Sequence, residues 1–485
     1  MAVTVPRETE PAISPYLEGN YAPIHREITA ENLEVIGELP DDLAGMFIRT
    51  GSNPRFHPNG RYHWFDGDGM LHGIELEDGS ATYRNRYIHT KGLEDDIEAG
   101  SSLRTGIMEQ PDITNPDGPW KDTANTDLVF HSGKLLALWW LSGKAHQIRL
   151  PDLETEGPCD FGGTLDTNMA SHAKVDPATG EMIFIDYGPL PPYLRYGVVS
   201  PEGEVVHSTP IELPGFRLQH DVGLTQNHAL LFDMSMMWDP EEMKQGRVRL
   251  GFFPERASRI GVIPRYGDGS DVRWFETEPF FMYHTIACWE EGDDIVMIGC
   301  RIPDPMGWEA KGRSGRNAPL LGNLRIEPYL SQWRLNMRTG RVDEAQLDDR
   351  ITEFPRINDQ FLARQARYSY NGRIADSPTM LFDGFVKYDL TDGTSEEYGY
   401  PEGWYGGEPS FAPSTNARAE DDGYLLTFVA QEASGRSELY VVHAQTLETV
   451  ARIVIPQRVP TGYHTRWVDH SDLNAASAAH ANGAH

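Results

Sequence analysis

The amino-acid sequence predicts an all-β protein, a seven-bladed β-propeller with its active site on the axis and covered by loops. Three observations lead to this prediction. Short β-rich runs alternate with turn residues from about residue 30 to residue 470, hardly any stretch has apolar residues at helical spacing, and no linker interrupts the pattern. Hairpins at this density must bury their faces against one another, and large sandwiches, barrels and propellers can do so at 485 residues. Seven blades would use about 60 to 70 residues each, although no fixed-period repeat supports the count.

The predicted hairpins follow one another along the chain, each with its turn residues in view. Ser132-Gly133 marks the turn of the first, and Gly292 to Asp294 marks that of the fourth. The hairpins cover residues 128–140, 173–188, 196–208, 286–300, 330–347, 385–399 and 421–456.

One stretch, HWFDGDGMLHG at residues 63–73, resembles the start of a calcium loop. Asp66, Asp68 and Glu77 fall at positions 1, 3 and 12 of the EF-hand spacing, but residues 70–72 lack the oxygen ligands and the glycine that the loop requires. The sequence instead predicts a tight Asp-Gly-Asp-Gly hairpin turn between the two flanking apolar stretches.

Composition excludes some classes of protein. Asp and Glu outnumber Lys and Arg by 73 to 42, for a formal charge of -31, so the chain would repel nucleic acid. The three cysteines, Cys159, Cys288 and Cys300, are too widely spaced for a zinc ribbon or a disulfide framework. No secretory signal and no run of 18 apolar residues is found, so we expect a cytoplasmic protein.

The predicted domain organisation is simple. Residues 1–30 form an N-terminal arm, residues 30–470 form a single propeller domain, and the low-complexity residues 471–485 form a disordered tail.

Four of the 17 histidines lie at or near the mouth of a predicted β-run: His172, His220, His284 and His464. None has HxH or HExxH spacing, so only blades converging on a propeller axis could bring the four together. Taken singly, each is more often a packing or hydrogen-bonding residue than a metal ligand. The spacing leaves both interpretations open.

The order of motifs along the chain resembles the carotenoid cleavage oxygenases, a family of non-haem iron enzymes that includes apocarotenoid oxygenases, lignostilbene dioxygenases and isoeugenol-type oxygenases. The motifs run in the family's order over nearly the whole chain. They are YLEGNYAPI, LAGMFIRTGSNPRF, HWFDGDGMLHG, TANTDLVFHSGKLLAL, SHAKVDPATGEM, HDVGLT, ITEFPRIND, GGEPSFAP and VPTGYHTRW.

The resemblance implies that the four histidines bind Fe(II). Neutral imidazoles suit this ion, and four of them leave up to two positions of an octahedron for dioxygen, the co-substrate, or water. In the family, glutamates accept the outer ring N–H groups, and Glu353 and Glu408 match two of them. At the position of the third glutamate this chain has Trp140, so one imidazole has another acceptor or the site is tuned differently.

The resemblance also implies contacts to dioxygen and substrate. Thr126 matches a threonine whose methyl group crowds one open metal position, and Phe65 matches a residue that borders the substrate. Lys134 aligns with a lysine that stilbene-cleaving members aim at a phenolic oxygen. Ile107 and Met108 stand where those members have a tyrosine, and neither side chain donates a hydrogen bond.

The predicted function is therefore oxidative cleavage of a C=C bond by O2 to give two carbonyl products, with a carotenoid or apocarotenoid as substrate. The alternative substrate is a stilbene or phenylpropenoid, and a second alternative function is a non-catalytic propeller binding module. The implied partner is an apolar conjugated alkene, with peripheral membrane contact at the tunnel mouth. Oligomeric state is not predicted.

Overall fold

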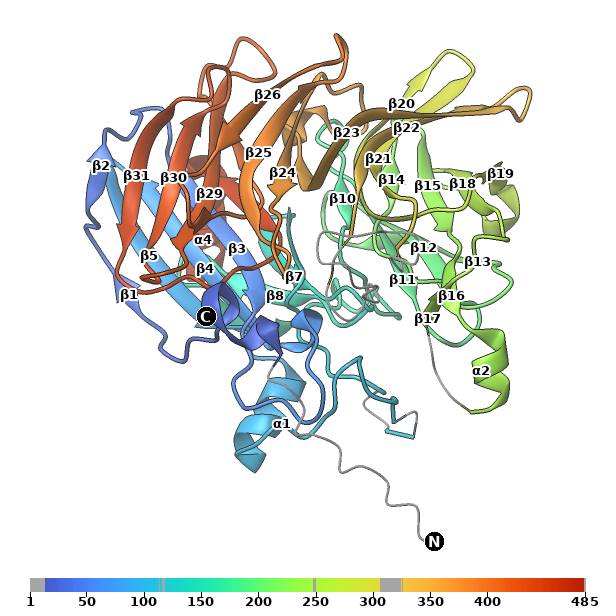
Figure 1. The fold of residues 1–485 in the computed structure, drawn as a ribbon, viewed down its shortest axis with the longest axis horizontal. Coiled ribbons are helices and arrows are strands. Elements are labelled where there is room, and N and C mark those ends of the chain that lie inside the picture. The colour runs from blue at the N-terminus through green and yellow to red at the C-terminus, as the bar shows by residue number, and fades with distance from the viewer. Residues whose placement is uncertain are drawn as a thin grey trace, which may run out of the picture.

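The computed structural model describes residues 14–483, except residues 113, 116–117, 247–249, 306–323 and 325. Its antiparallel sheets follow one another around a ring (Figure 1). Three of them are four-stranded. Their strands are β6 (Asp127–His131), β7 (Lys134–Leu138), β8 (His146–Arg149) and β9 (Glu154–Pro158); β10 (Lys174–Val175), β11 (Met182–Tyr187), β12 (Leu194–Val199) and β13 (Val205–Ile211); and β14 (Gly223–Leu224), β15 (His228–Asp233), β18 (Ser258–Pro264) and β19 (Arg273–Thr277).

A seven-stranded sheet forms two further blades, because β22 and β24 pair with different halves of the long strand β23. Its strands are β20 (Phe281–Glu291), β21 (Asp294–Ile302), β22 (Tyr329–Asn336), β23 (Val342–Arg356), β24 (Tyr368–Ile374), β25 (Phe382–Asp389) and β26 (Thr394–Gly399). The strands β16 (Met236–Trp238) and β17 (Leu250–Phe252), which lie between β15 and β18 in the sequence, form a separate two-stranded sheet.

The last two blades close the ring by pairing strands from opposite ends of the chain. One contains β1 (Thr29–Ala30), β3 (Gly45–Ser52), β4 (Gly69–Glu77), β5 (Ser80–Tyr87) and the C-terminal β32 (Thr465–Asp469). The other contains the N-terminal β2 (Val35–Gly37) with β27 (Trp404–Tyr405), β28 (Ser410–Pro413), β29 (Gly423–Gln431), β30 (Ser437–His443) and β31 (Thr449–Ile455). The described residues thus form seven blades, and the prediction of an all-β propeller is confirmed.

Apolar side chains of adjacent blades pack against each other and hold the ring together. Phe47 on β3 and Ile74 on β4 lie in one buried cluster with Leu426 and Val441 of the next blade. This packing lets blades meet side by side without leaving an apolar face in water.

The Asp-Gly-Asp-Gly stretch is not the predicted hairpin turn. Residues Trp64–Asp66 form a 3-10 helix, and Met70 pairs with Gly51 and Tyr87 instead of with the preceding apolar residues. Gly67 has a φ of -70°, whereas the predicted type of hairpin turn needs positive φ. The two aspartates bind elsewhere in the fold: Asp66 accepts a hydrogen bond from the amide of Ile107, and Asp68 forms a salt bridge with Lys121.

The described part of the chain also contains helices that the sequence analysis did not predict, α1 (Lys91–Ala99) and the short α2 (Pro240–Lys244). Thr90 caps the start of α1, and Gly100, with φ of 70°, ends it. Most of the tail predicted to be disordered is α4 (His470–Gly483), which begins directly after β32 and buries Leu473 against the first blades. Its alanines favour helix formation. None of the helices among the described residues has the length and hydropathy that a membrane crossing needs.

Candidate active site and metal centre

The four histidines singled out in the sequence meet on the axis of the propeller. His172, His220 and His464 each lie just before a strand at the edge of its sheet, and His284 lies on such an edge strand, β20. One ring nitrogen from each of the four lies within 4.8 Å of those of the others, and all four side chains are buried. The sheets carry these residues together because the edge strands of different blades converge on the axis.

Carboxylates lie behind three of the four imidazoles. Nδ1 of His284 lies 2.5 Å from Oε2 of Glu353, and Nδ1 of His464 lies 2.9 Å from Oε1 of Glu408. Nδ1 of His172 lies 3.5 Å from Oδ2 of Asp127, which also accepts the backbone N–H of His172 at 2.9 Å. These contacts direct each Nε2 away from the carboxylate.

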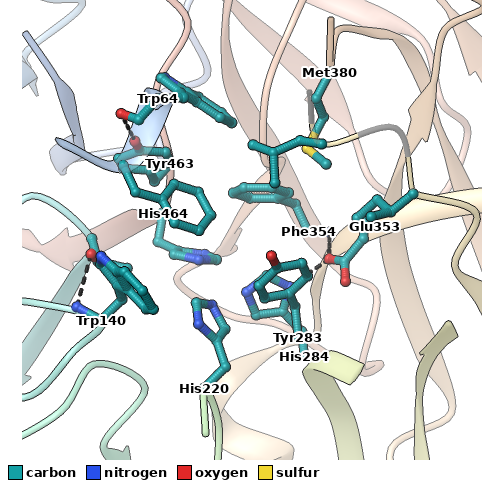
Figure 2. Close-up of a pocket in the computed structure, with 14 residues that line it drawn as sticks. Trp64, Trp140, His220, Tyr283, His284, Glu353, Phe354, Met380, Tyr463 and His464 are labelled. Carbon is teal, nitrogen blue, oxygen red and sulfur yellow. Dashed lines mark hydrogen bonds and ion pairs between the residues drawn. The ribbon is translucent and has the colours of Figure 1, made fainter. Parts of the chain in front are cut away.

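His220 differs from the other three histidines. Its Nδ1 atom is buried and has no hydrogen-bond partner among the described residues. Trp140, at the position where relatives carry the third glutamate, lines the cavity together with His220 and offers no acceptor there (Figure 2).

The residues fit a first-row divalent metal ion. Imidazole nitrogens bind such ions at about 2.0 to 2.1 Å, so two ligands at right angles lie about 3 Å apart. Nε2 of His172 lies 3.1 Å from Nε2 of His220, and Nε2 of His284 is a buried nitrogen without a hydrogen-bond partner among the described residues. Two buried acceptors facing each other at this distance need a shared cation or proton between them.

Burial and the neighbouring imidazoles hold the pKa of His172, His220 and His284 below the ordinary value. All three are therefore neutral at physiological pH, which is the form that binds metal. Burial raises the pKa of Glu353 to about 8. Burial also opposes ionisation of Glu408, but the charges of His464 and Arg356 and the hydrogen bonds from His464 and Thr465 outweigh it and lower its pKa to about 2.

A narrow cavity of about 20 Å³ is lined by His220, His284 and His464 (Figure 2). Its wall is mainly apolar and aromatic. The lining residues besides the histidines include Trp64, Phe65, Thr126, Trp140, Tyr283, Phe354, Met380 and Tyr463. Such a wall excludes water and suits a flat, apolar ligand.

The hydroxyl group of Thr126 is fully used within the protein. It donates to Oδ1 of Asn125 at 2.9 Å and accepts the backbone N–H of Trp140 at 3.0 Å. The side chain lines the cavity, so its methyl group is the part left to meet a ligand. Phe65 also lines this cavity, next to Trp140 at a ring-centroid distance of 5.4 Å.

Three other residues predicted to bind substrate do not line this cavity. Lys134 is exposed at the turn between β6 and β7. It is not among the residues that line the cavity, and its predicted substrate contact stays a prediction. Ile107 lines a separate, more polar pocket that also touches Phe65. Met108 lines neither pocket and offers its carbonyl oxygen to Arg61.

Sequence reasoning missed Asp127 and Tyr283. Asp127 lies next to Thr126 at the start of a predicted strand, and Tyr283 directly precedes His284. Adjacency to predicted site residues is the only signal that could have found them.

A second, polar cavity of about 340 Å³ also reaches the histidines. His172, His284 and His464 line it together with charged residues, among them an ion pair between Lys174 and Asp221 at 2.8 Å. His284 and His464 therefore line both the apolar cavity and the polar one.

Comparisons with known proteins agree with this fold and site. The family described as Retinal pigment epithelial membrane protein matches residues 21–469. A carotenoid 9,10(9',10')-cleavage dioxygenase from Crocus sativus is 36% identical over 94% of this chain and 90% of its own length. A carotenoid cleavage oxygenase from Mycobacterium tuberculosis is 32% identical over 94% of this chain and 97% of its own length.

Solved structures show the same architecture. The crystal structure of Pseudomonas brassicacearum lignostilbene dioxygenase superposes with a TM-score of 0.84 at 27% identity, covering 94% of this chain and 99% of that one. A cobalt-substituted apocarotenoid oxygenase from Synechocystis has a TM-score of 0.79 at 24% identity, covering 93% and 98% of the two chains, and supports the fold.

A closed propeller with four buried imidazoles on its axis and an apolar cavity beside them defines a class of protein, the metal-dependent propeller oxygenases. The chain belongs to the carotenoid cleavage oxygenase family. The predicted family, fold and enzyme class, a dioxygenase, are confirmed.

Proposed function

We propose that this protein is an Fe(II)-dependent dioxygenase that cleaves a C=C bond of a carotenoid or apocarotenoid to give two carbonyl products. The single observation that carries the proposal is the convergence of His172, His220, His284 and His464, with ligand atoms within 4.8 Å of one another, beside a narrow apolar cavity. The carotenoid-cleaving relatives at 32 to 37% identity support the choice of substrate.

The four imidazoles would hold the ferrous ion, and an iron centre with open positions supplies the activation of dioxygen. The roles of this chain's own residues follow from their contacts. In their ionised forms, Glu353 and Glu408 would keep the protons of His284 and His464 on Nδ1, so that each Nε2 lone pair is free. Asp127 holds the backbone of His172, whose φ of 66° is a strained conformation that only a fixed neighbour can maintain.

The cavity wall would orient the alkene and exclude water. Phe65, Trp140 and Phe354 provide aromatic surfaces against which a conjugated chain can pack, and the Thr126 methyl group narrows the space near the histidines. Because the free volume of the cavity is small, a polyene can enter only in an extended form. Side chains on the cavity wall must move to admit it.

Cleavage of a stilbene or phenylpropenoid is the second candidate. It is favoured by the structural likeness to a lignostilbene dioxygenase at 27% identity. Lys134, which the sequence comparison offered as a phenol contact, does not support it, because this side chain is exposed away from the cavity.

We also propose a cytoplasmic location and contact with a membrane surface. All three cysteines are free and buried, as expected in a reducing compartment. Leu103 and Leu190 are 53% and 76% exposed, and exposed apolar side chains can contact a bilayer surface.

The test is anaerobic loading with Fe(II), followed by oxygen and separate incubations with an apocarotenal, a hydroxystilbene and isoeugenol. We expect aldehyde fragments from the apocarotenal. Cleavage of the stilbene alone would favour the second candidate, and cleavage of no probe by iron-loaded protein would leave only a binding module.

A further inference from the structure

The hydroxyl group of Tyr283 points into the cavity beside His220, His284 and His464 (Figure 2). The side chain is only 5% exposed, and its hydroxyl oxygen has no hydrogen-bond partner among the described residues. Tyr463, on the wall of the same cavity, differs: its hydroxyl group lies 2.7 Å from Oγ of Ser52 and 2.6 Å from the carbonyl oxygen of Trp64. Buried hydroxyl groups are almost always paired, so an unpaired one that faces a ligand cavity points to a polar atom of the ligand.

The surroundings of Tyr283 place this hydroxyl group at the metal end of the cavity. Tyr283 directly precedes His284, and its ring centroid lies 4.7 Å from that of His220. On its other sides the ring meets Phe281 at 4.9 Å and Phe65 at 6.3 Å. These aromatic rings offer no strong acceptor, so the phenol faces the cavity without a bonded partner on the protein side.

We propose that the substrate carries a carbonyl or hydroxyl oxygen, and that Tyr283 donates a hydrogen bond to this oxygen within the cavity. The inference rests on the proposed function and narrows it. It favours oxygenated alkenes, such as polyene aldehydes or hydroxystilbenes, over hydrocarbon polyenes of the same length. Tyr283 is then a specificity-determining residue, because a hydrocarbon would leave its hydroxyl group buried and unpaired.

The experiment measures binding without turnover. Protein loaded with Fe(II) under argon is titrated with two matched pairs of probes, a polyene aldehyde with the hydrocarbon of equal conjugated length, and 4-hydroxystilbene with stilbene. We expect each oxygenated probe to bind about tenfold more tightly than its partner, as one hydrogen bond allows. Preference within only one pair identifies whether the oxygen is a carbonyl or a phenol.

The variant Tyr283→Phe removes the hydroxyl oxygen and keeps the ring. It should abolish this preference by weakening only the oxygenated probe, while the matched variant Tyr463→Phe, which loses an internally bonded hydroxyl group, should keep it. Equal affinity for both members of each pair in the unmodified protein overturns the inference even if a variant fails to fold. Unchanged preference in Tyr283→Phe does so as well.

Exposure of the same samples to oxygen separates this inference from the proposed function. Selective binding with no aldehyde products would contradict the proposed function and leave the Tyr283 contact standing. Aldehyde products without selective binding would support the proposed function and contradict the Tyr283 contact.

Discussion

The Nδ1 atom of His464 lies 2.9 Å from Oε1 of Glu408, and both side chains are buried on the axis of the propeller. The other carboxylate oxygen of Glu408 accepts the backbone N–H and the hydroxyl group of Thr465 at 2.6 and 2.7 Å. Glu408 therefore fixes the orientation of its histidine from three directions. This rigidity is what a metal ligand needs, because a fixed ring loses no freedom when the ion binds.

The variant Glu408→Gln should lower metal affinity about 10- to 100-fold, because an amide oxygen is a weaker acceptor for His464 and one amide cannot replace both carboxylate oxygens. Anaerobic titration with Fe(II) against a competing chelator measures the change. The matched control is Glu397→Gln, which removes a surface carboxylate paired with Arg350 and Arg373. Equal affinity in the two variants would contradict the role assigned to Glu408.

Trp140→Glu should strengthen metal binding about tenfold, since it places an acceptor on the side of His220 and that imidazole now lacks one. The same Fe(II) titration checks it. Trp140→Phe keeps an aromatic wall without adding an acceptor, so its metal affinity should stay unchanged. If Trp140→Glu releases metal more readily than the unmodified protein, the missing acceptor for His220 is not what limits the metal affinity.

Lys134→Ala should leave cleavage of every probe unchanged and should alter the free energy of unfolding by less than about 0.5 kcal/mol. Lys134 is exposed and does not line the cavity, so no ligand within the cavity meets it. Steady-state kinetics with an apocarotenal and a hydroxystilbene test this directly. A rise in KM for the phenolic probe alone would restore the contact suggested by the sequence comparison.

Gly45→Ala should destabilise the ring closure by about 2 to 3 kcal/mol. Gly45 has φ of 148°, and a Cβ atom built on it would lie 2.4 Å from the carbonyl oxygen of Val468 on the partner strand β32. Gly79→Ala separates the cost of a positive φ from the cost of crowding. Gly79 has φ of 72° but no atom close to an added Cβ, so this variant should cost about 1 kcal/mol. Urea unfolding measures both, and equal losses would mean that crowding against β32 contributes nothing.

Glu290 should make stability depend on pH well away from the metal centre. Burial opposes its ionisation, but hydrogen bonds from Thr225, Asn227 and His228 lower its pKa to about 2 from 4.5. Because the folded pKa is depressed, the stabilisation is present above about pH 4.5 and is lost as the pH falls towards 2.

Glu290→Gln should therefore lower the free energy of unfolding at pH 7 by about 1 kcal/mol, allowing for solvent screening of this partly exposed group. The difference from the unmodified protein should shrink between pH 4.5 and pH 2. Urea unfolding at several pH values checks it, and a difference that stays constant down to pH 2 would rule out the carboxylate as its source.

Much of the fold could be predicted because turns and hairpins depend on residues that are neighbours in the sequence. In the hairpin around Ser132-Gly133 both turn residues have positive φ, 50° and 72°, and they join β6 to β7 as the sequence indicated. The four histidines were identifiable through the family resemblance, because each lies within or beside one of its motifs. The Asp-Gly-Asp-Gly stretch misled the same reasoning, since its aspartates bind Ile107 and Lys121 from distant segments.

The sequence by itself determined the all-β character, the succession of hairpins and the four histidines, since turn chemistry and motif residues act over a few neighbouring positions. Only the tertiary structure decided that Lys134 faces solvent, that His220 lacks an acceptor and that the hydroxyl group of Tyr283 is unpaired in the cavity. The reason is physical. The cavity lies where edge strands of different blades meet, so its contacts join residues far apart in the chain, and no local pattern records which of them become neighbours.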